Sequence, residues 1–114
     1  MKIAVSSMGK NLTDSMSNVF GRSPYFIITE IENGEIKETE IIENKSADQM
    51  GGAGISAAQL MAEKNVNALI TSNVGPRALD VLKQFNITIY YGDGKVKEVL
   101  QKFIDGKLKK NELI

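Results

Sequence analysis

An Asn33-Gly34 pair between two strand-like runs constrains the fold of this chain more than any other feature. Asn-Gly supplies the two positive-φ residues of a type I′ turn, which joins antiparallel strands. The run before it, residues 25–31, is rich in aromatic and β-branched side chains. The run after it, residues 36–42, carries one lysine and two glutamates. The sequence therefore predicts a β-hairpin whose second strand lies at a sheet edge, where charges discourage further pairing.

The remaining elements alternate between strands and helices. Short strands are expected at residues 2–7, 68–70 and 87–91. Helices are expected over residues 55–64, from Pro76 onward, and over residues 96–104. The spacing of apolar residues predicts three buried helix faces: Ile55, Ala58, Met61 and Ala62; then Ala78, Leu82 and Phe85; then Val96, Val99, Leu100, Phe103 and Ile104.

This order predicts an α/β fold built on a mixed sheet. Strand–helix–strand units force parallel pairing through right-handed crossovers, whereas the hairpin adds an antiparallel edge. We expect the first, fourth and fifth strands at the centre, the hairpin to one side, and helices on both faces. The 114 residues are expected to form a single domain, 1–114. Its ordered part should cover about residues 2–107, with a frayed tail at 108–114.

The chain contains no histidine and no cysteine, which restricts its chemistry. Disulfides, thiolate metal sites and a thiol nucleophile are excluded. The 14 basic and 14 acidic residues balance, so nucleic acid is not an expected partner. No apolar run approaches the roughly 20 residues that span a bilayer, and no signal peptide is recognised, so we expect a soluble cytoplasmic protein without a membrane partner. Only two residues are arginines, Arg22 and Arg77.

A glycine-rich loop, Gly51-Gly52-Ala53-Gly54, leads directly into a predicted helix. Free backbone N–H groups and the helix dipole make such a start an anion-binding site. The same glycines also suit a tight turn and close packing of helix on sheet, so both interpretations stay open. The loop lacks the Lys-Ser/Thr ending of a nucleotide P-loop, and ATP hydrolysis is not expected.

Two further loops carry candidate binding residues. Asn73 and Gly75 follow a parallel strand, at the sheet edge where ligands of α/β proteins bind, although an ordinary capped turn has the same pattern. Arg22 suits bidentate recognition of an anion, or it pairs with a carboxylate such as Asp14.

Catalysis and metal coordination are not expected. Met8, Met16 and Met50 are soft sulfur donors, but methionine more commonly serves packing, so no metal ligands are assigned. The serines have no histidine base, and the first strand has no carboxylate for a two-metal nuclease site. A metal-dependent hydrolase built on Asp14 and Asp48 is the weakest alternative.

Three blocks in this chain resemble one family. They are residues 20–26 (Phe-Gly-Arg-Ser-Pro-Tyr-Phe), 52–60 (Gly-Ala-Gly-Ile-Ser-Ala-Ala-Gln-Leu) and 73–79 (Asn-Val-Gly-Pro-Arg-Ala-Leu). In order and spacing the chain is similar to the dinitrogenase iron–molybdenum cofactor-binding family, which includes nitrogenase cofactor carriers and small stand-alone archaeal and bacterial proteins. The resemblance covers roughly Lys2 to Lys107. It implies a ribonuclease H-like three-layer fold with a five-stranded mixed sheet, one antiparallel edge hairpin strand and helices on both faces.

The loops and the resemblance together indicate a cofactor-binding face. The candidate residues are Phe20, Gly21, Arg22, Met50, Gly51, Gly52, Ala53, Gly54, Asn73 and Gly75. Many relatives have a histidine before Phe-Gly-Arg, where this chain has Val19, and a second that opens the Gly-Ala-Gly loop.

Our leading hypothesis is a small non-catalytic carrier related to nitrogen fixation. Its ligand would be an anionic metal–sulfur cofactor, such as the iron–molybdenum cofactor or an iron–sulfur precursor. The alternative is a cofactor-free protein–protein interaction or regulatory module on the same fold.

Overall fold

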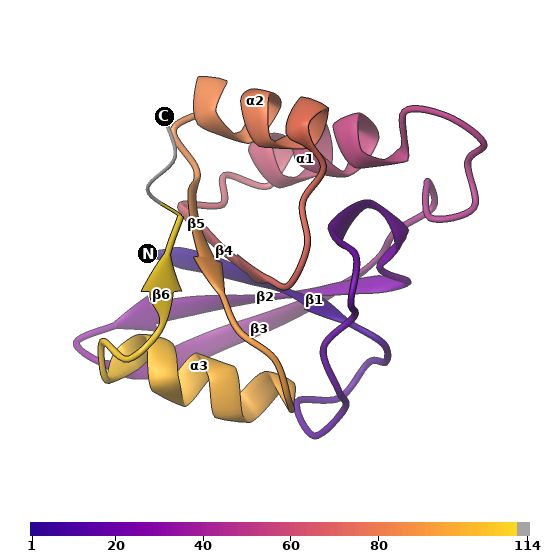
Figure 1. Ribbon diagram of the computed structural model, residues 1–114. Coiled ribbons are helices and arrows are strands. Elements are labelled where there is room, and N and C mark those ends of the chain that lie inside the picture. Colours follow the sequence, from indigo (N-terminus) through magenta and orange to yellow (C-terminus); the bar gives the residue numbers. More distant parts are fainter. Residues whose placement is uncertain (112–114) are drawn as a thin grey trace.

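The computed structural model describes residues 1–111 and forms a mixed sheet with helices on both faces (Figure 1). The elements along the chain are β1 (Lys2–Ser7), the 3-10 helix η1 (Phe20–Arg22), β2 (Tyr25–Glu32), β3 (Glu35–Glu43), α1 (Ala53–Glu63), β4 (Ala68–Thr71), α2 (Pro76–Gln84), β5 (Thr88–Tyr91), α3 (Val96–Ile104) and β6 (Lys109–Lys110).

The sheet has six strands in the order β3-β2-β1-β4-β5-β6. β4 runs parallel to both β1 and β5, and the other neighbours pair antiparallel. The predicted central position of β1 and β4, and of β5 among the parallel strands, is confirmed. The antiparallel strand of the hairpin was expected at the edge of the sheet, and that position is wrong. The strand that runs antiparallel to its neighbours is β2, which lies inside the sheet between β1 and β3. β3 reverses again and so runs in the direction of β1.

The sixth strand corrects the prediction of five strands and of a tail frayed from residue 108. Lys109 and Lys110 pair with Tyr91 and Tyr90 of β5, and the Asn111 N–H donates to the Ile89 carbonyl at 2.8 Å. Two lysines carry no strand signal, and the open edge of β5 provides their backbone partners. Leu108 packs against the core on the α3 side, and Asn111 Nδ2 donates to the Tyr91 hydroxyl at 2.8 Å, so contacts on either side of the lysines hold the segment in place. Residues 112–114 of the predicted tail lie outside the described residues.

The Asn-Gly hairpin is confirmed. Asn33 and Gly34 have φ values of 53° and 77°, both positive as a type I′ turn requires. β3 lies at the edge of the sheet as predicted, and most of its side chains are exposed.

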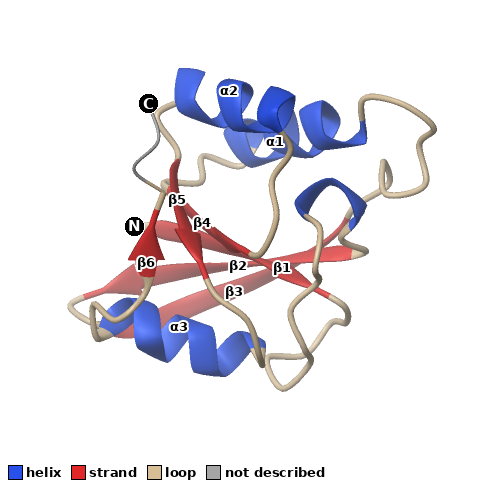
Figure 2. Cartoon of the chain, viewed as in Figure 1, coloured by secondary structure: helices blue, strands red, loops and turns tan. Residues whose placement is uncertain are grey.

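Helices cover the two faces unequally, with α1 and α2 on one face and α3 on the other (Figure 2). Alternate residues of β1 serve the two cores: Ala4 faces α1 and α2, whereas Ile3 and Val5 face α3. The prediction for α3 is confirmed, with Val96, Val99 and Leu100 fully buried and Phe103 and Ile104 half-buried.

Two predictions about buried helix faces need correction. Phe85 is 54% exposed, because α2 ends at Gln84 and the chain turns away through Asn86 at φ 58°. In α1, Ala57 is buried in place of Ile55 and Ala62, which are half-buried. The helix begins at Ala53, two residues earlier than predicted.

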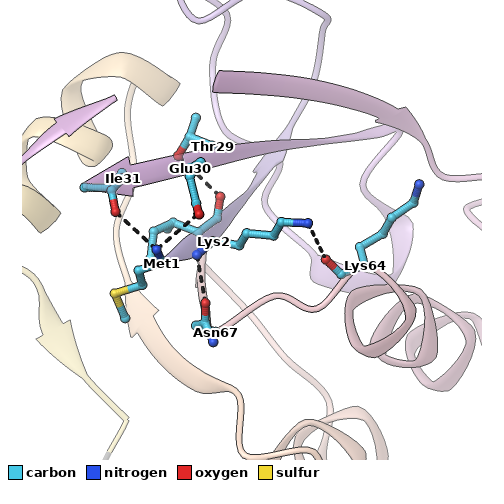
Figure 3. A network of polar contacts seen from close by, with 8 residues as sticks. Met1, Lys2, Thr29, Glu30, Ile31, Lys64 and Asn67 are labelled. Carbon is cyan, nitrogen blue, oxygen red and sulfur yellow. Dashed lines mark hydrogen bonds and ion pairs between the residues drawn. The ribbon is translucent and has the colours of Figure 1, made fainter. Parts of the chain in front are cut away.

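At the end of the sheet where β1 begins, a polar network fixes β1 between its neighbours (Figure 3). The Met1 ammonium lies 3.1 Å from the Glu30 carboxylate and donates to the Ile31 carbonyl. The Lys2 N–H donates to Asn67 Oδ1 at 2.8 Å, and Lys2 Nζ donates to the Lys64 carbonyl at 3.4 Å. These contacts join β1, β2 and the segment before β4.

Candidate functional site

A cleft of about 440 Å³ is lined by residues of η1 and of the N-terminal ends of α1 and α2. Figure 1 shows how these segments are arranged on one side of the sheet. The lining of the cleft includes most of the predicted site residues: Gly21, Arg22, Met50, Gly51, Gly52, Ala53, Gly54 and Gly75. It also includes residues that the sequence did not single out as site residues: Val19, Ile55, Pro76, Arg77 and Ala78. The three predicted loops therefore do form one face of the molecule.

Phe20 and Asn73 belong to the predicted site but do not line the cleft. Phe20 is 1% exposed and packs in the core against Phe26, with ring centroids 5.3 Å apart. Its N–H donates to the Asn73 carbonyl at 2.9 Å, and Asn73 Nδ2 donates to the Asn18 carbonyl at 2.7 Å. These two residues tie the loop after β4 to η1 and thereby hold two walls of the cleft together.

Four of the five glycines of the site fall into two groups, and the fifth, Gly52, has a positive φ of 73°. A Cβ on Gly21 would lie 2.7 Å from the Gly54 nitrogen, and a Cβ on Gly54 would lie 3.1 Å from Ala78 Cβ. At these two positions η1, α1 and α2 approach one another closely, which is packing of helix on helix and not the packing of helix on sheet that the sequence suggested. A Cβ on Gly51 or Gly75 would have no atom within 4 Å, so no neighbouring atom requires glycine there.

The helix starts at the cleft lack the partners that helix starts usually have. Neither α1 nor α2 has a side-chain cap or an acidic residue in its first turn, and their N-caps are Gly52 (φ 73°) and Gly75. In contrast, at the start of α3 the Lys95 N–H donates to the Glu98 carboxylate, and the next two N–H groups donate to loop carbonyls of residues 14 and 12. Uncapped N–H groups and two helix dipoles thus converge on the cleft and make it attractive to anions.

Both arginines of the chain line this cleft. Arg22 Nη1 donates to the carbonyls of Ala47, at 2.9 Å, and Gln49. The pairing with Asp14 considered from the sequence is not formed, because the Asp14 carboxylate accepts the Asn11 N–H instead. Arg77 is exposed, and within residues 1–111 neither arginine has a carboxylate partner. Among residues 1–111 no acidic side chain lines the cleft, so none of them neutralises its positive charge there.

Asn44 supports the site, although the sequence did not single it out. It is 5% exposed, and its Nδ2 donates to the carbonyls of Gly21, at 3.2 Å, and Ser23, at 2.8 Å. Its Oδ1 accepts the Ser46 N–H at 3.2 Å. Asn44 therefore fixes η1 relative to the start of the segment that follows β3. It stands in a polar stretch, residues 44–50, where nothing in the pattern distinguishes it from its neighbours.

The three candidate sulfur donors do not form one group. Met16 is buried in the core beneath α3, whereas Met50 is fully exposed at the cleft on the other face of the sheet. Met8 is 56% exposed and does not line the cleft. The described part of the chain contains no cluster of three or more acidic side chains able to hold a metal ion. No helix among these residues is long and apolar enough to cross a membrane.

The chain is similar to several known proteins over nearly its whole length. The protein MJ0580 of Methanocaldococcus jannaschii is 43% identical over 113 residues, which cover 98% of this chain and 92% of the relative. The apo form of the orange protein from Desulfovibrio gigas superposes with a TM-score of 0.90 at 30% identity, covering 97% of this chain and 92% of that one.

A NifB-type protein of Thermotoga, TM1290, gives a TM-score of 0.83 at 34% identity, over 99% and 95% of the two chains. The family model described as dinitrogenase iron–molybdenum cofactor matches residues 1–106. With that match and these relatives, the chain belongs to the dinitrogenase iron–molybdenum cofactor family.

Proposed function

We propose that this protein is a small non-catalytic carrier that binds an anionic metal–sulfur cofactor in the cleft between η1, α1 and α2. The iron–molybdenum cofactor or an iron–sulfur precursor is the ligand that the family description suggests. We place the carrier in the cytoplasm, in a pathway related to nitrogen fixation, on a fold of the ribonuclease H-like type.

One observation carries this proposal: the cleft combines two uncapped helix N-termini with both arginines of the chain and, among the described residues, no carboxylate. An anion there would accept N–H groups from the first turns of α1 and α2 and charge-assisted hydrogen bonds from the arginines. The open space at Gly51 and Gly75 lets a bulky ligand approach the backbone.

The rest of the lining favours a soft, bulky anion over a small oxyanion. Val19, Met50, Ile55 and Pro76 add apolar and thioether surface to the cationic wall. Sulfide-bridged clusters have polarisable surfaces that suit such side chains, whereas phosphate would leave them unused. Because the chain has no histidine or cysteine, the ligand would be held by charge and backbone N–H groups, without a strong metal–protein bond.

The same residues argue against catalysis and against nucleic acid. The chain has no histidine or thiol, and no carboxylate of residues 1–111 lines the cleft to act as a base or nucleophile. With 14 basic and 14 acidic residues the chain has no net positive charge, which does not favour binding to a phosphate backbone.

Anaerobic incubation with isolated iron–molybdenum cofactor, followed by repurification and elemental analysis, tests the proposal. We expect the wild-type chain to retain molybdenum and iron, and Arg77→Gln to retain much less. Lys97→Gln, which removes one positive charge on α3 on the other face of the sheet, is the matched control and should retain the wild-type amount. If the wild-type protein retains no metal, the carrier function is wrong.

The second candidate, a cofactor-free interaction module, is favoured by exposed apolar residues at the cleft, Val19 at 45% and Met50 at 100%. Affinity capture from native lysate by the metal-free protein would then recover a partner, and Met50→Ser should abolish that recovery. Recovery of a partner only after cofactor loading would contradict this second candidate.

A further inference from the structure

We infer that Arg22 binds on two sides at once, with Nη1 holding the loop of residues 45–51 and the Nε–Nη2 edge holding the anion. Binding of the anion then immobilises this loop. The inference rests on the proposed function, because it concerns the same cleft.

The loop of residues 45–51 has few ties to the rest of the protein. Its backbone hydrogen bonds are local, from the Ala47 N–H to the Asn44 carbonyl and from the Gln49 N–H to the Ser46 carbonyl. At its start, the Ser46 N–H donates to Oδ1 of Asn44, which itself donates to the Gly21 and Ser23 carbonyls. Beyond Ser46, the ties to other elements are the two bonds from Arg22 and a long contact of 3.5 Å between Ser56 Oγ and Gln49 Oε1. Arg22 is therefore the main anchor of the loop beyond Ser46.

The guanidinium group has donors left for a ligand. It carries five N–H groups in a planar fork, of which the two on Nη1 are directed at the loop carbonyls. Within residues 1–111 no hydrogen bond is formed by Nε or Nη2. These atoms provide the parallel pair of donors that bidentate anion recognition uses, on a residue that lines the cleft.

The same loop supplies part of the cleft wall. Met50 and Gly51 belong to it and line the cleft, and Gln49 Nε2 donates to the Gly51 carbonyl. When an anion fixes the guanidinium, both carbonyls bonded to Nη1 are fixed as well, and the wall formed by Met50 is held over the ligand. Arg77 also lines the cleft, from the first turn of α2, and has no hydrogen bond to this loop, so it adds charge without this coupling.

Hydrogen–deuterium exchange of the Ala47 and Gln49 amides tests the coupling. The probe is tetrathiomolybdate, a small metal–sulfur dianion, and its binding is measured separately by equilibrium dialysis. In the wild-type protein, saturating probe should slow exchange of these amides about tenfold, the effect of one added charge-assisted hydrogen bond. In Arg22→Gln, exchange should be about tenfold faster without probe and should not slow when probe is added.

Two further variants separate the coupling from a general loss of charge. Arg77→Gln should bind the probe more weakly. Without probe, however, its loop amides should exchange at the wild-type rate, and at saturating probe their exchange should slow as much as in the wild-type protein. Arg22→Lys keeps the charge but has a single donor atom, so it should bind the probe without slowing loop exchange.

The outcomes distinguish this inference from the proposed function. If the wild-type protein binds the probe and loop exchange is unchanged, the coupling is wrong and the anion site stands. If Arg22→Gln exchanges as slowly as the wild-type protein without probe, Arg22 is not the anchor. If the wild-type protein does not bind the probe, both proposals are overturned.

Discussion

Substitution of Gly21 by alanine should destabilise the protein strongly, although it adds only one methyl group. The new Cβ would lie 2.7 Å from the Gly54 nitrogen, 2.8 Å from Gly54 Cα and 3.2 Å from the Ala53 carbonyl carbon. All three are backbone atoms at the start of α1, so no side-chain rotation relieves the overlap. Either η1 or the first turn of α1 must move.

The expected cost follows from the kind of contact. Overpacking a filled core costs typically about 1–3 kcal/mol, and contacts below 3.0 Å with rigid backbone put this substitution at the upper end, about 3 kcal/mol. The unfolding entropy is about 2.1 cal/mol/K per residue, and the chain has 114 residues. A loss of 1 kcal/mol in the free energy of unfolding therefore lowers the melting temperature by about 4 °C. Gly21→Ala should therefore melt about 12 °C below the wild-type protein.

Circular dichroism during heating and urea titration measures this difference. The matched control is Gly51→Ala, in the same cleft, where the new Cβ meets nothing within 4 Å. That variant should melt at or slightly above the wild-type temperature. Alanine reduces the conformational entropy of the unfolded chain, which raises the free energy of unfolding by about 0.4–1 kcal/mol. A Gly21→Ala melting temperature within about 3 °C of the wild-type protein, below the roughly 4 °C expected for the mildest overpacking, would refute the reasoning.

Three other outcomes follow from the same structure. Asn44→Ala should lower the free energy of unfolding by about 2–3 kcal/mol, since it leaves the Gly21 and Ser23 carbonyls without their side-chain donor. Urea unfolding measures this loss, and a value below about 0.5 kcal/mol contradicts the anchoring role of Asn44. Leu82→Ala should lower the free energy of unfolding by about 2–5 kcal/mol, whereas Phe85→Ala should lower it by less than about 1 kcal/mol, because Leu82 is buried and Phe85 is exposed. Urea unfolding measures both, and equal losses would place Phe85 in the core. Tetrathiomolybdate affinity, measured by equilibrium dialysis, should fall as salt rises from about 0.01 M to about 0.15 M, because screening shortens from about 30 Å to about 8 Å; an unchanged affinity would exclude a charge-held ligand.

Local patterns in the sequence predicted most of the fold, because they determine local structure. The Asn33-Gly34 turn requires positive φ at both residues, and both have it. Pro76 lies at the first helical position after Gly75, as its fixed φ and missing N–H favour. The failures concern elements whose structure depends on distant partners. β6 exists because the edge of β5 is open, and Phe85 leaves the helix face because the chain turns after Gln84.

The candidate site was predictable in its loops but not in its supports. Gly21, Arg22 and the glycines before α1 stand in recognisable motifs, and all of them line the cleft. Asn44 shows no pattern of its own, since its role depends on two carbonyls more than 20 residues away. Arg77 was noted only as one of two arginines. Its place in the cleft depends on how α2 packs beside α1, which no spacing of charges reveals.

The meeting of α1 and α2 at one cleft follows from the topology of the sheet. β3, β4 and β5 run in the same direction, and the order β3-β2-β1-β4-β5 makes the chain move the same way across the sheet in both crossovers. Successive right-handed crossovers in one direction place their helices on the same face. β3 and β4 also end on the same side of the sheet, and α1 and α2 begin there after their connecting loops. Both uncapped N-termini therefore lie at the carboxyl ends of these strands. The connection from β5 to β6 ends antiparallel, which frees α3 from that rule, and α3 lies on the other face with its first turn filled by the loop after β1. The anion-attracting cleft is therefore a consequence of two parallel crossovers, and the arginines add charge at a place that the backbone has already made positive.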